Sequence, residues 1–550
     1  MEKIKNLILK IWVTVRVEGP LTFFEKSLRR IKRVKKYTYQ DWIRDFEQKD
    51  FSKEKPLLKF QPKFILLIFV SEAKTEAVNQ TFKSIKQQLY PNFETISLKD
   101  VKTRALTWKD LLKTIQGDYI VPIKAGDQLS PTALFEIAKL LNTQDLDLIY
   151  SDEDFLDTSG KRESPAFKPD YSPEFLESTN YIGNLVAVKK ETLGKTFLRD
   201  SSVKWSNYEL PLAVKEVSRA FGHIPEVLYH NPKSKESPSN EIEILGQHLK
   251  RLGREVEVKE TSFLGVFETR EKLKADSKAT IIILCGGHWD YLKRCLESIY
   301  RKTSYKNFEV MAVDNSVDAS FETKIKSNFR EVIYRKDWEK PFNFSKLYNQ
   351  AVKNIKTDFV LLLNDDTEAV NDDWIESLLE QGQKEGVGVV GAKLLYPNRT
   401  VQQAGIIVGY NGERAGNAFV GEKADSPGYL NRLVSVQNYS AVTGACLLVK
   451  KQLYDQVGGL DEKLAVAFND VDFCLKIIKE GYRVVWTPYS QLIHYESITR
   501  GEDLDLKRKL RLVEEENYFK DRWKDYLSDG DPYYNPNLSL NVKTFEVRRE

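Results

Sequence analysis

The sequence predicts an α/β protein with two tandem domains of mainly parallel sheet and helical extensions at both ends. Three observations predict this fold class: the length, the order of the elements and an internal repeat. The chain has 550 residues, which is more than one domain usually holds. Apolar strand-like runs alternate with helical stretches in each half, as at 65–70 before a helix to 88 and at 279–284 before a helix to 300. Such alternation forms Rossmann-like sheets with short functional loops at the strand ends.

The internal repeat divides the chain into two similar halves. Four segments of the first half recur in the same order in the second half, and the shared order indicates a duplication. The paired segments are 84–94 with 298–309, 115–120 with 355–360, 183–190 with 444–451, and Pro225 and His230 with Pro488 and His494. The offset between the copies grows along the chain, as loop insertions in the second copy would produce.

The repeat and the charge distribution set the expected domain boundaries. We expect a basic helical extension at 1–58, a degenerate and non-catalytic first domain at 59–232, a linker with a helix at 233–277, a catalytic domain at 278–500 and a C-terminal helical extension and tail at 501–550. Residues 1–40 hold eleven lysines and arginines against three glutamates, with apolar residues interleaved. Such a helix can lie on an anionic membrane surface, or pack on the protein with its basic face in water, and both interpretations stay open.

Composition excludes several classes of function. An apolar content of 41%, a charged content of 30% and a net charge of +4 indicate an ordinary soluble domain protein and no nucleic acid partner. The longest strongly apolar run, 64–70, is too short to cross a bilayer, and basic residues interrupt the first apolar stretch, so we expect no secretory signal. The four cysteines lack paired metal-ligand spacing, which favours reduced, buried thiols in the cytoplasm.

Acidic residues that follow an apolar strand form the most informative motif of the chain. The run 359–366 ends in an asparagine and two aspartates, and a second acidic cluster at 468–473 contains Asp470. Mg²⁺ and Mn²⁺ prefer hard oxygen ligands and often share them with phosphate. The strand-end acids therefore predict a metal site, and Asp470 is the predicted base, with a pKa that partial burial and neighbouring acids raise.

Three further side chains complete the parts that are needed to expel a nucleoside diphosphate from a sugar. Asp314 ends a strand after a strand–helix unit, where a carboxylate can bind a ribose or a base edge. His494 follows a strand-like segment and is a candidate metal ligand, and Arg500 offers a guanidinium to a phosphate. Together with Asp470 as base and a metal that offsets charge on the leaving phosphate, they predict a transfer reaction.

The first copy lacks the acids that the second copy carries at the corresponding places. By sequence, Asp314 aligns with Lys99, 364–366 with 124–126, and Asp470 and Asp472 with Tyr208 and Leu210. A lysine in place of a metal-facing acid repels the cation, so we expect the first copy not to catalyse by the same chemistry. Asp127 is the acid that remains there, and the acids at 152–154 leave a different site open beside the plainer interpretation of a solvated loop.

The second half resembles a family 2 glycosyltransferase with the GT-A fold. The segments that carry the resemblance are 313–315, 362–366, 443–446, 458–462, 468–473 and His494. The whole chain is similar to tandem bacterial members that build O-antigen, rhamnose-rich or related surface polysaccharides, and the segments 39–43 and 531–538 look like those members too. The resemblance thus implies two tandem GT-A domains.

The resemblance also implies an inverting transferase and roles for named residues. It implies a dTDP-, UDP- or GDP-sugar as donor, with rhamnose the preferred guess, and Mg²⁺ or Mn²⁺ held by Asp366 with help from His494. It implies Asp314 on the nucleotide and Asp470 as base. The further residues that we assign with it are Asn315, Asn349, Asn364, Asp365 and Arg500 for the nucleotide sugar, and Thr443, Gly444, Ala445 and Asp472 for the acceptor or donor sugar.

Two departures from the family pattern and two alternative functions stay open. The segment 285–288 reads Cys-Gly-Gly-His where relatives carry Pro-Thr-x-Asn, and Gln403 and Asn417 stand where relatives often carry histidine. Nucleotide and acceptor contacts are therefore expected to differ. The alternatives are a bifunctional transferase with both domains active and a non-enzymatic glycan-binding or scaffold protein. For the enzyme we expect a glycan acceptor, lipid-linked if residues 1–40 contact the inner face of the plasma membrane.

Overall fold

The computed structural model describes two compact units. The described residues are 37–47, 58–70, 74–98, 106–232, 240–274, 277–286, 288–337, 339–410, 414–495, 506–541 and 545–549. One unit comprises Met1–Lys55 with Val547–Glu550, and the other comprises Pro56–Glu546. The basic segment 1–36, Lys99 and Arg500 lie outside the described residues, so the predictions made for them stay predictions.

The described part of the small unit is a short capped helix. Helix α3 (Tyr39–Trp42) begins after Thr38, whose side chain accepts the N–H of Asp41, and one π-helical turn (Ile43–Glu47) continues it. The guanidinium of Arg548 lies 4.4 Å from the ring centre of Phe46 within the same unit.

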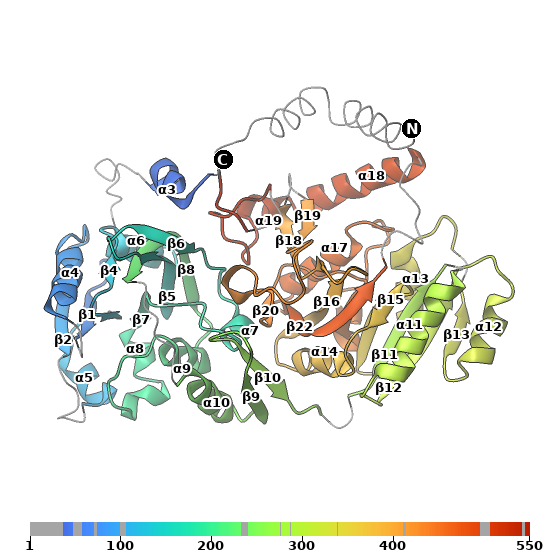
Figure 1. Cartoon of the computed structure of the whole chain (residues 1–550), viewed down its shortest axis with the longest axis horizontal. Helices are drawn as coiled ribbons and strands as arrows, with labels where there is room; N and C mark the ends of the chain where they lie inside the picture. Colours follow the sequence, from blue (N-terminus) through green and yellow to red (C-terminus); the bar gives the residue numbers. More distant parts are fainter. Residues whose placement is uncertain are drawn as a thin grey trace. The chain divides into compact units, whose positions relative to one another are not determined.

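The first sheet of the large unit belongs to the first half of the chain (Figure 1). Its strand order is β2-β1-β3-β7-β5-β8-β4, with β6 paired to β5. The strands are β1 (Phe64–Phe69), β2 (Phe93–Leu98), β3 (Tyr119–Lys124), β4 (Gln128–Leu129), β5 (Leu148–Leu156), β6 (Arg162–Ala166), β7 (Val186–Lys189) and β8 (Phe221–Pro232). All six residues of β1 are buried, because alternate side chains enter two separate cores on the two faces of the sheet.

Helices and a hairpin complete the first half. The helices are α4 (Thr75–Lys86), α5 (Trp108–Thr114), α6 (Ala133–Leu141), α7 (Pro173–Leu176), α8 (Lys190–Leu193), α9 (Glu209–Val217) and α10 (Glu241–Arg251), and the hairpin joins β9 (Val256–Glu260) to β10 (Phe267–Glu271). Asp110 lies in the first turn of α5, where Thr107 caps the helix by accepting its N–H. Apolar residues of the helices α6, α9 and α10 belong to the cores on the sheet faces.

The second sheet repeats the plan of the first and extends it (Figure 1). Its order is β13-β12-β11-β14-β21-β16-β22-β15, with β17 on β16 and β20 on β22. The strands are β11 (Ala279–Cys285), β12 (Phe308–Asp314), β13 (Ile333–Lys336), β14 (Phe359–Asn364), β15 (Thr367–Ala369), β16 (Val387–Leu395), β17 (Val401–Gln403), β20 (Gln437–Asn438), β21 (Cys446–Lys450) and β22 (Arg483–His494); β18 (Ile406–Gly409) and β19 (Arg414–Asn417) form a separate pair.

Helices cover the second sheet and continue beyond it. They are α11 (Trp289–Lys302), α12 (Phe321–Asn328), α13 (Phe344–Val352), α14 (Trp374–Gly382), α16 (Lys451–Gln456), α17 (Asn469–Lys479), α18 (Leu506–Arg522) and α19 (Lys524–Asp529). Trp374 of α14 is fully buried against the core of the sheet. In the part of the chain that the structure describes, no helix combines the length and apolarity needed to cross a bilayer.

The α/β fold class is confirmed, with one refinement to the direction of the strands. Strands β13, β12, β11 and β14 are parallel, as predicted. Strand β21 runs antiparallel to both of its neighbours, and β15 is antiparallel to β22, so the sheet is mixed beyond β14.

The pairing registers of the two sheets match the sequence repeat. Phe64 pairs with Phe93 and Tyr119 in the first sheet, and Ala279 pairs with Phe308 and Phe359 in the second. The repeat had aligned the last two members of each set, 93 with 308 and 119 with 359. Equivalent sequence positions therefore occupy equivalent places in two sheets.

Ion pairs join the two halves within the large unit. Arg483 of β22 makes a two-point contact with the buried Glu174, with nitrogen–oxygen distances of 2.8 and 3.1 Å. Glu177, also buried, contacts Lys215 at 2.5 Å and Arg254 at 2.7 Å from its own half and Lys384 at 3.3 Å from the other. A buried carboxylate that several cations share is destabilised when one charge is removed, so these contacts fix the halves together.

Candidate active site at the strand ends of the second sheet

Asp314 ends strand β12 and is completely buried. One carboxylate oxygen accepts the N–H of Ser316 at 2.7 Å, and the other accepts the Tyr334 hydroxyl at 2.8 Å and the Lys336 ammonium at 2.7 Å. The Lys336 side chain is 41% exposed, so this strand end presents a cation that Asp314 holds. Asn315 follows at the same edge, where its N–H donates to the end of β11 at 3.0 Å.

Asp366 and His494 meet where β14 and β22 end. Nε2 of His494 lies 3.1 Å from Oδ1 of Asp366 and 3.2 Å from the side-chain nitrogen of Asn364. The antiparallel pairing of β15 with β22 places Thr367 opposite His494, which brings the two distant segments together. Asp366 and His494 are both buried.

Gln402, to which no sequence motif points, orients His494. Nδ1 of His494 donates to Oε1 of Gln402 at 2.7 Å, and the Gln402 amide nitrogen donates to the His494 carbonyl at 3.3 Å. Gln402 lies on β17 and is buried. With the proton on Nδ1, the lone pair of Nε2 faces Asp366, which is the arrangement of a metal-binding histidine and its supporting hydrogen bond.

The pair Asp366 and His494 fits a divalent cation. Two ligand atoms 3.1 Å apart match neighbouring positions around an octahedral ion whose bonds are about 2.1 Å long. Among the described residues, no group of three or more His, Cys, Asp or Glu side chains gathers as a closed metal site. The remaining positions around an ion would therefore belong to phosphate and water, as Mg²⁺ and Mn²⁺ allow.

Asp470 lies at the start of α17 with a half-buried side chain. The Gly444 N–H donates to one carboxylate oxygen at 2.9 Å, and the Val471 N–H donates to the other at 2.9 Å. Burial raises the pKa of Asp470 above its ordinary value, while these two N–H groups and the Thr443 hydroxyl pull it down. The result is a fixed carboxylate with more basic character than an exposed aspartate.

A short series of contacts joins Asp470 to the metal pair. The N–H of Asn364 donates to the Ala445 carbonyl at 3.1 Å, and the Ala445 N–H donates to the Thr443 hydroxyl at 3.3 Å. A Cβ on Gly444 would stand 3.5 Å from that of Asp470. The loop 443–445 therefore connects the end of β14 to Asp470. Asp314 ends β12, which lies two strands from β14 in the sheet, a separation of roughly 10 Å at the usual strand spacing.

Asp472 points away from this site. It is fully buried, and its Oδ1 accepts the Trp523 indole N–H at 2.9 Å and lies 3.0 Å from Arg522 Nε. Residues two apart on a helix face different sides, so the structure does not bring the carboxylates of Asp470 and Asp472 together. Burial raises the pKa of Asp472, and its neighbours Trp523 and Arg522 oppose that rise.

Asn349 supports a loop instead of facing the strand ends. Its side-chain nitrogen donates to the Leu460 carbonyl at 2.9 Å and to Glu462 at 3.2 Å, and its oxygen accepts the Tyr454 hydroxyl at 2.7 Å and the Leu460 N–H at 2.9 Å. A Cβ on Gly459, whose φ is +66°, would lie 2.4 Å from this oxygen. The structure does not bring Asn349 together with the other predicted site residues.

The remaining predicted residues fall into three groups. Asp365 is buried at the end of β14, beside Asp366. Gln403 is buried on β17, whereas Asn417 is exposed at the end of β19. All four cysteines are free and buried, as predicted, and burial raises the pKa of Cys295 to about 12.

The sequence of this half matches a known family. Residues 280–458 match the family model described as glycosyl transferase family 2. The segment 280–458 is therefore a family 2 glycosyltransferase domain. The matched range contains the strand-end residues 314 and 364–366 and the loop 443–445, and ends before α17.

Two relatives are similar to most of this chain, including the first domain. The O-antigen biosynthesis protein RfbC of Myxococcus xanthus is 30% identical over 543 residues, which is 90% of this chain and 41% of that protein. The protein y4gI of Sinorhizobium fredii (strain NBRC 101917 / NGR234) is 34% identical over 458 residues, 79% of this chain and 50% of that protein. This chain thus spans half or less of the length of these two relatives.

A solved structure also resembles part of the chain. The crystal structure of GalNAc-T7 with UDP, GalNAc and Mn²⁺ is 16% identical and covers 46% of this chain and 50% of that chain, with a TM-score of 0.36.

The first domain keeps an acid and a histidine at the places of Asp366 and His494, but each has a different partner. His494 pairs with Thr367 in the glycosyltransferase domain, and His230 pairs with Gln128 in the first sheet. The preceding residue is Asp366 in one case and Asp127 in the other, so the sequence alignment of 366 with 126 was wrong by one residue. The reason is one extra residue between the end of β3 and β4, which the sequence does not reveal.

Both residues have other partners in the first domain. Asp127 accepts the Tyr229 hydroxyl at 2.7 Å, and Nδ1 of His230 lies 2.6 Å from Asp154. Burial raises the pKa of Asp127 to about 7, against the opposing effect of Tyr229. The two side chains that would hold a cation are therefore held by tyrosine and aspartate.

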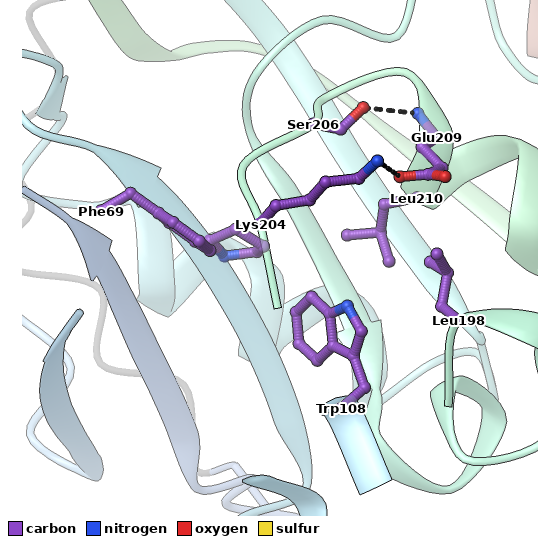
Figure 2. A pocket seen from close by; sticks show the side chains of 8 residues that line it. Phe69, Trp108, Leu198, Lys204, Ser206, Glu209 and Leu210 are labelled. Carbon is purple, nitrogen blue, oxygen red and sulfur yellow. Dashed lines mark hydrogen bonds and ion pairs between the residues drawn. The ribbon is translucent and has the colours of Figure 1, made fainter. Parts of the chain in front are cut away.

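A small hollow in the first domain lies where α9 begins, the place that α17 and Asp470 hold in the glycosyltransferase domain (Figure 2). Helix α9 starts at Glu209 and α17 at Asn469, so by the helix starts Leu210 stands at the position of Asp470. The sequence alignment, which placed Tyr208 there, was therefore shifted by two residues. Lys204 lies 3.6 Å from Glu209, and Trp108 and Leu210 line the hollow with other side chains. Its volume is about 10 Å³, room for one water and no sugar.

Proposed function

We propose that the glycosyltransferase domain moves a sugar from a nucleoside-diphosphate donor to a glycan acceptor, with Asp470 as the base. The observation that carries the proposal is the contact series from the Asp366–His494 pair through Asn364 and Ala445 to Asp470. It unites a place for a metal-bound diphosphate with a carboxylate that can take a proton.

Asp470 would remove the proton of the acceptor hydroxyl as its oxygen attacks the anomeric carbon. The bond from that carbon to the diphosphate oxygen breaks, and its electron pair leaves with the nucleoside diphosphate. Attack on the face opposite the leaving group inverts the anomeric configuration. A base is useful when its pKa is raised toward the working pH, and burial acts in that direction on Asp470.

The donor would lie across the strand ends. Asp366 and His494 would hold Mg²⁺ or Mn²⁺, and the ion would neutralise charge on the departing phosphate. Asp314 would act on the nucleotide side through the partners that it fixes, since Lys336 offers an ammonium that Asp314 orients. Arg500 remains the proposed phosphate contact from the segment outside the described residues.

The first domain would serve as a scaffold and not as a second transferase. Three features support this role: the bonding of Asp127 and His230 to other partners, the small volume near Leu210, and the ion pairs of Glu174 and Glu177 with the other half. The bifunctional alternative would require a rearrangement of buried side chains. A purely glycan-binding role would leave the catalytic arrangement near Asp470 without a purpose.

A surface polysaccharide is the proposed acceptor class. The name of the Myxococcus xanthus relative, O-antigen biosynthesis protein, supports it. The donor remains one of the dTDP-, UDP- or GDP-sugars, with dTDP-rhamnose first in the proposed screen. A lipid-linked acceptor and a membrane contact through residues 1–40 are proposals that a deletion of that segment would test by membrane fractionation.

The decisive experiment compares equivalent carboxylates in the two domains. The purified chain is screened with nucleotide sugars, with and without Mn²⁺, and released nucleoside diphosphate is measured. We expect Asp470→Asn and Asp366→Asn to lose at least about 100-fold in transfer, and the matched control Asp127→Asn to retain it. Transfer that survives both changes in the second domain, or that is lost in the control alone, would refute this assignment.

A further inference from the structure

Helix α18 reaches back to the loop that carries the catalytic carboxylate. Glu515 is a buried residue of this helix. Its carboxylate accepts three consecutive backbone N–H groups, from Ala465 at 3.1 Å, Val466 at 3.3 Å and Ala467 at 2.6 Å. These residues come just before α17, which starts at Asn469, and Phe468 and Asn469 lie between them and Asp470.

A strained residue separates this cluster of N–H groups from Asp470. Phe468 has a φ of +60°, which a non-glycine residue adopts only when its surroundings hold it there. Its ring stacks on Phe519 of α18, with ring centres 5.0 Å apart. Glu515 and Phe519 are one helical turn apart, so one face of α18 contacts both the three N–H groups and Phe468.

The end of α18 also contacts residues on both sides of the segment 465–468. Tyr518 donates its hydroxyl to Asp461 at 2.9 Å, and Arg522 contacts both Asp461 and Asp472. Trp523 donates to Asp472 as well. The predicted sugar-site residue Asp472 thus serves as an anchor for the C-terminal extension.

We propose that Glu515 is a positioning residue for Asp470, which it holds in place through the backbone of residues 465–468. The inference rests on the proposed function, because it assigns a role relative to the base. Three N–H groups that converge on one carboxylate form a charge-assisted anchor, which is stronger and more directional than contacts between neutral groups. Loss of that anchor would let Phe468 relax and would shift Asp470 relative to Gly444.

The reaction gives this positioning a measurable effect. A displacement of about 1 Å in a reacting group can lower a rate by about 100-fold. The N–H groups of Gly444 and Val471 lower the pKa of Asp470 against the effect of burial, so a carboxylate that loses them titrates at higher pH. The proposed donor site lies at the ends of β12, β14 and β22, away from residues 465–468, so loss of the Glu515 carboxylate leaves the contacts of that site unchanged.

The test uses Glu515→Gln and Glu515→Ala in the full chain, with Glu516→Gln as the matched control. Glutamine keeps the shape of the side chain but places an NH₂ group against one of the three N–H donors. Glu516 is the adjacent, half-buried residue of α18, and it pairs with Arg414 at 2.9 Å and Lys520 at 3.2 Å. Measurements are kcat and donor KM, the pH profile of kcat, and amide hydrogen exchange of the peptide that covers 463–470.

The expected result is specific to positioning. Both Glu515 variants lower kcat by about 10- to 100-fold with donor KM within about twofold, move the acid limb of the profile to higher pH, and speed exchange in 463–470 alone. The Glu516 variant changes none of these. Unchanged kcat and an unchanged acid limb in the Glu515 variants would overturn the inference.

Two other outcomes are distinguishable from these. Faster exchange throughout α17 and α18, with a raised donor KM and an unmoved acid limb, would mean a merely structural role and would also overturn the inference. Absence of transfer by the unaltered chain with every nucleotide sugar would instead refute the proposed function, and the inference about Glu515 with it.

Discussion

Replacing Gln402 by leucine removes the hydrogen bond that orients the proposed metal ligand His494. The lost contact is the 2.7 Å bond between Nδ1 and Oε1, in a place where both side chains are buried. An unpaired buried N–H costs about 1–3 kcal/mol. Removal of such a supporting partner lowers metal affinity by about 10- to 100-fold, which corresponds to about 1.4–2.7 kcal/mol. We therefore expect the Mn²⁺ midpoint to rise by one to two decades.

The assay is a Mn²⁺ titration of nucleoside diphosphate binding, followed by calorimetry, so that it does not depend on turnover. The matched control is Gln403→Leu, a change of the adjacent buried glutamine on the same strand. The control loses stability but keeps the Mn²⁺ midpoint. An equal midpoint in Gln402→Leu and the unaltered chain would refute the role of His494 as a ligand that Gln402 orients.

Three further predictions concern buried carboxylates. Asp127→Asn should raise the free energy of unfolding in urea above about pH 4, by up to about 4 kcal/mol at pH 7. The folded pKa of Asp127 is about 7 and the ordinary value is 3.8, so ionisation of the buried carboxyl destabilises the folded state as pH rises. Equal stability of the two proteins at pH 7 would contradict this prediction. Glu177→Gln should cost about 3–5 kcal/mol at neutral pH, since Lys215, Lys384 and Arg254 hold the pKa of Glu177 well below its ordinary 4.5 despite burial. That contribution is present above pH 4.5 and disappears as pH falls through the lower folded pKa, so a pH-independent difference would be the contrary result. The kcat of transfer should fall on the acid side with a pKa above 3.8, because burial raises the pKa of Asp470, and Asp470→Asn should abolish the limb together with the rate.

The sequence was sufficient for the features that depend on neighbours along the chain. The alternation of apolar runs and helices predicted both sheets, because burial on two faces requires continuous apolar strands such as 64–69 and 359–363. The strand-end position of Asp314 and Asp366 followed from the same runs. The repeat was visible because equivalent positions keep equivalent surroundings, as the matched registers of Phe93 and Phe308 confirm.

Features that depend on which way a side chain points were not predictable. Asp470 and Asp472 share one motif, yet one faces the loop at Gly444 and the other faces α18. Asn349 was assigned to the nucleotide and instead binds the loop at Leu460. The signal that could have found Gln402 was weak, because a glutamine beside a second glutamine in a short strand has many ordinary explanations.

By itself the sequence determined the α/β class, the duplication and the strand that ends in acids, because these follow from local periodicity and short motifs. The family resemblance implied that Asp366 and His494 act together, but only the tertiary structure decided that the equivalent Asp127 and His230 take other partners. Asp366 lies 3.1 Å from His494, while Asp127 and His230, at equivalent places, bind Tyr229 and Asp154. The physical reason is that a pair separated by more than 100 residues forms only through strand register and the competition of nearby partners, and neither is written in the residues of the pair.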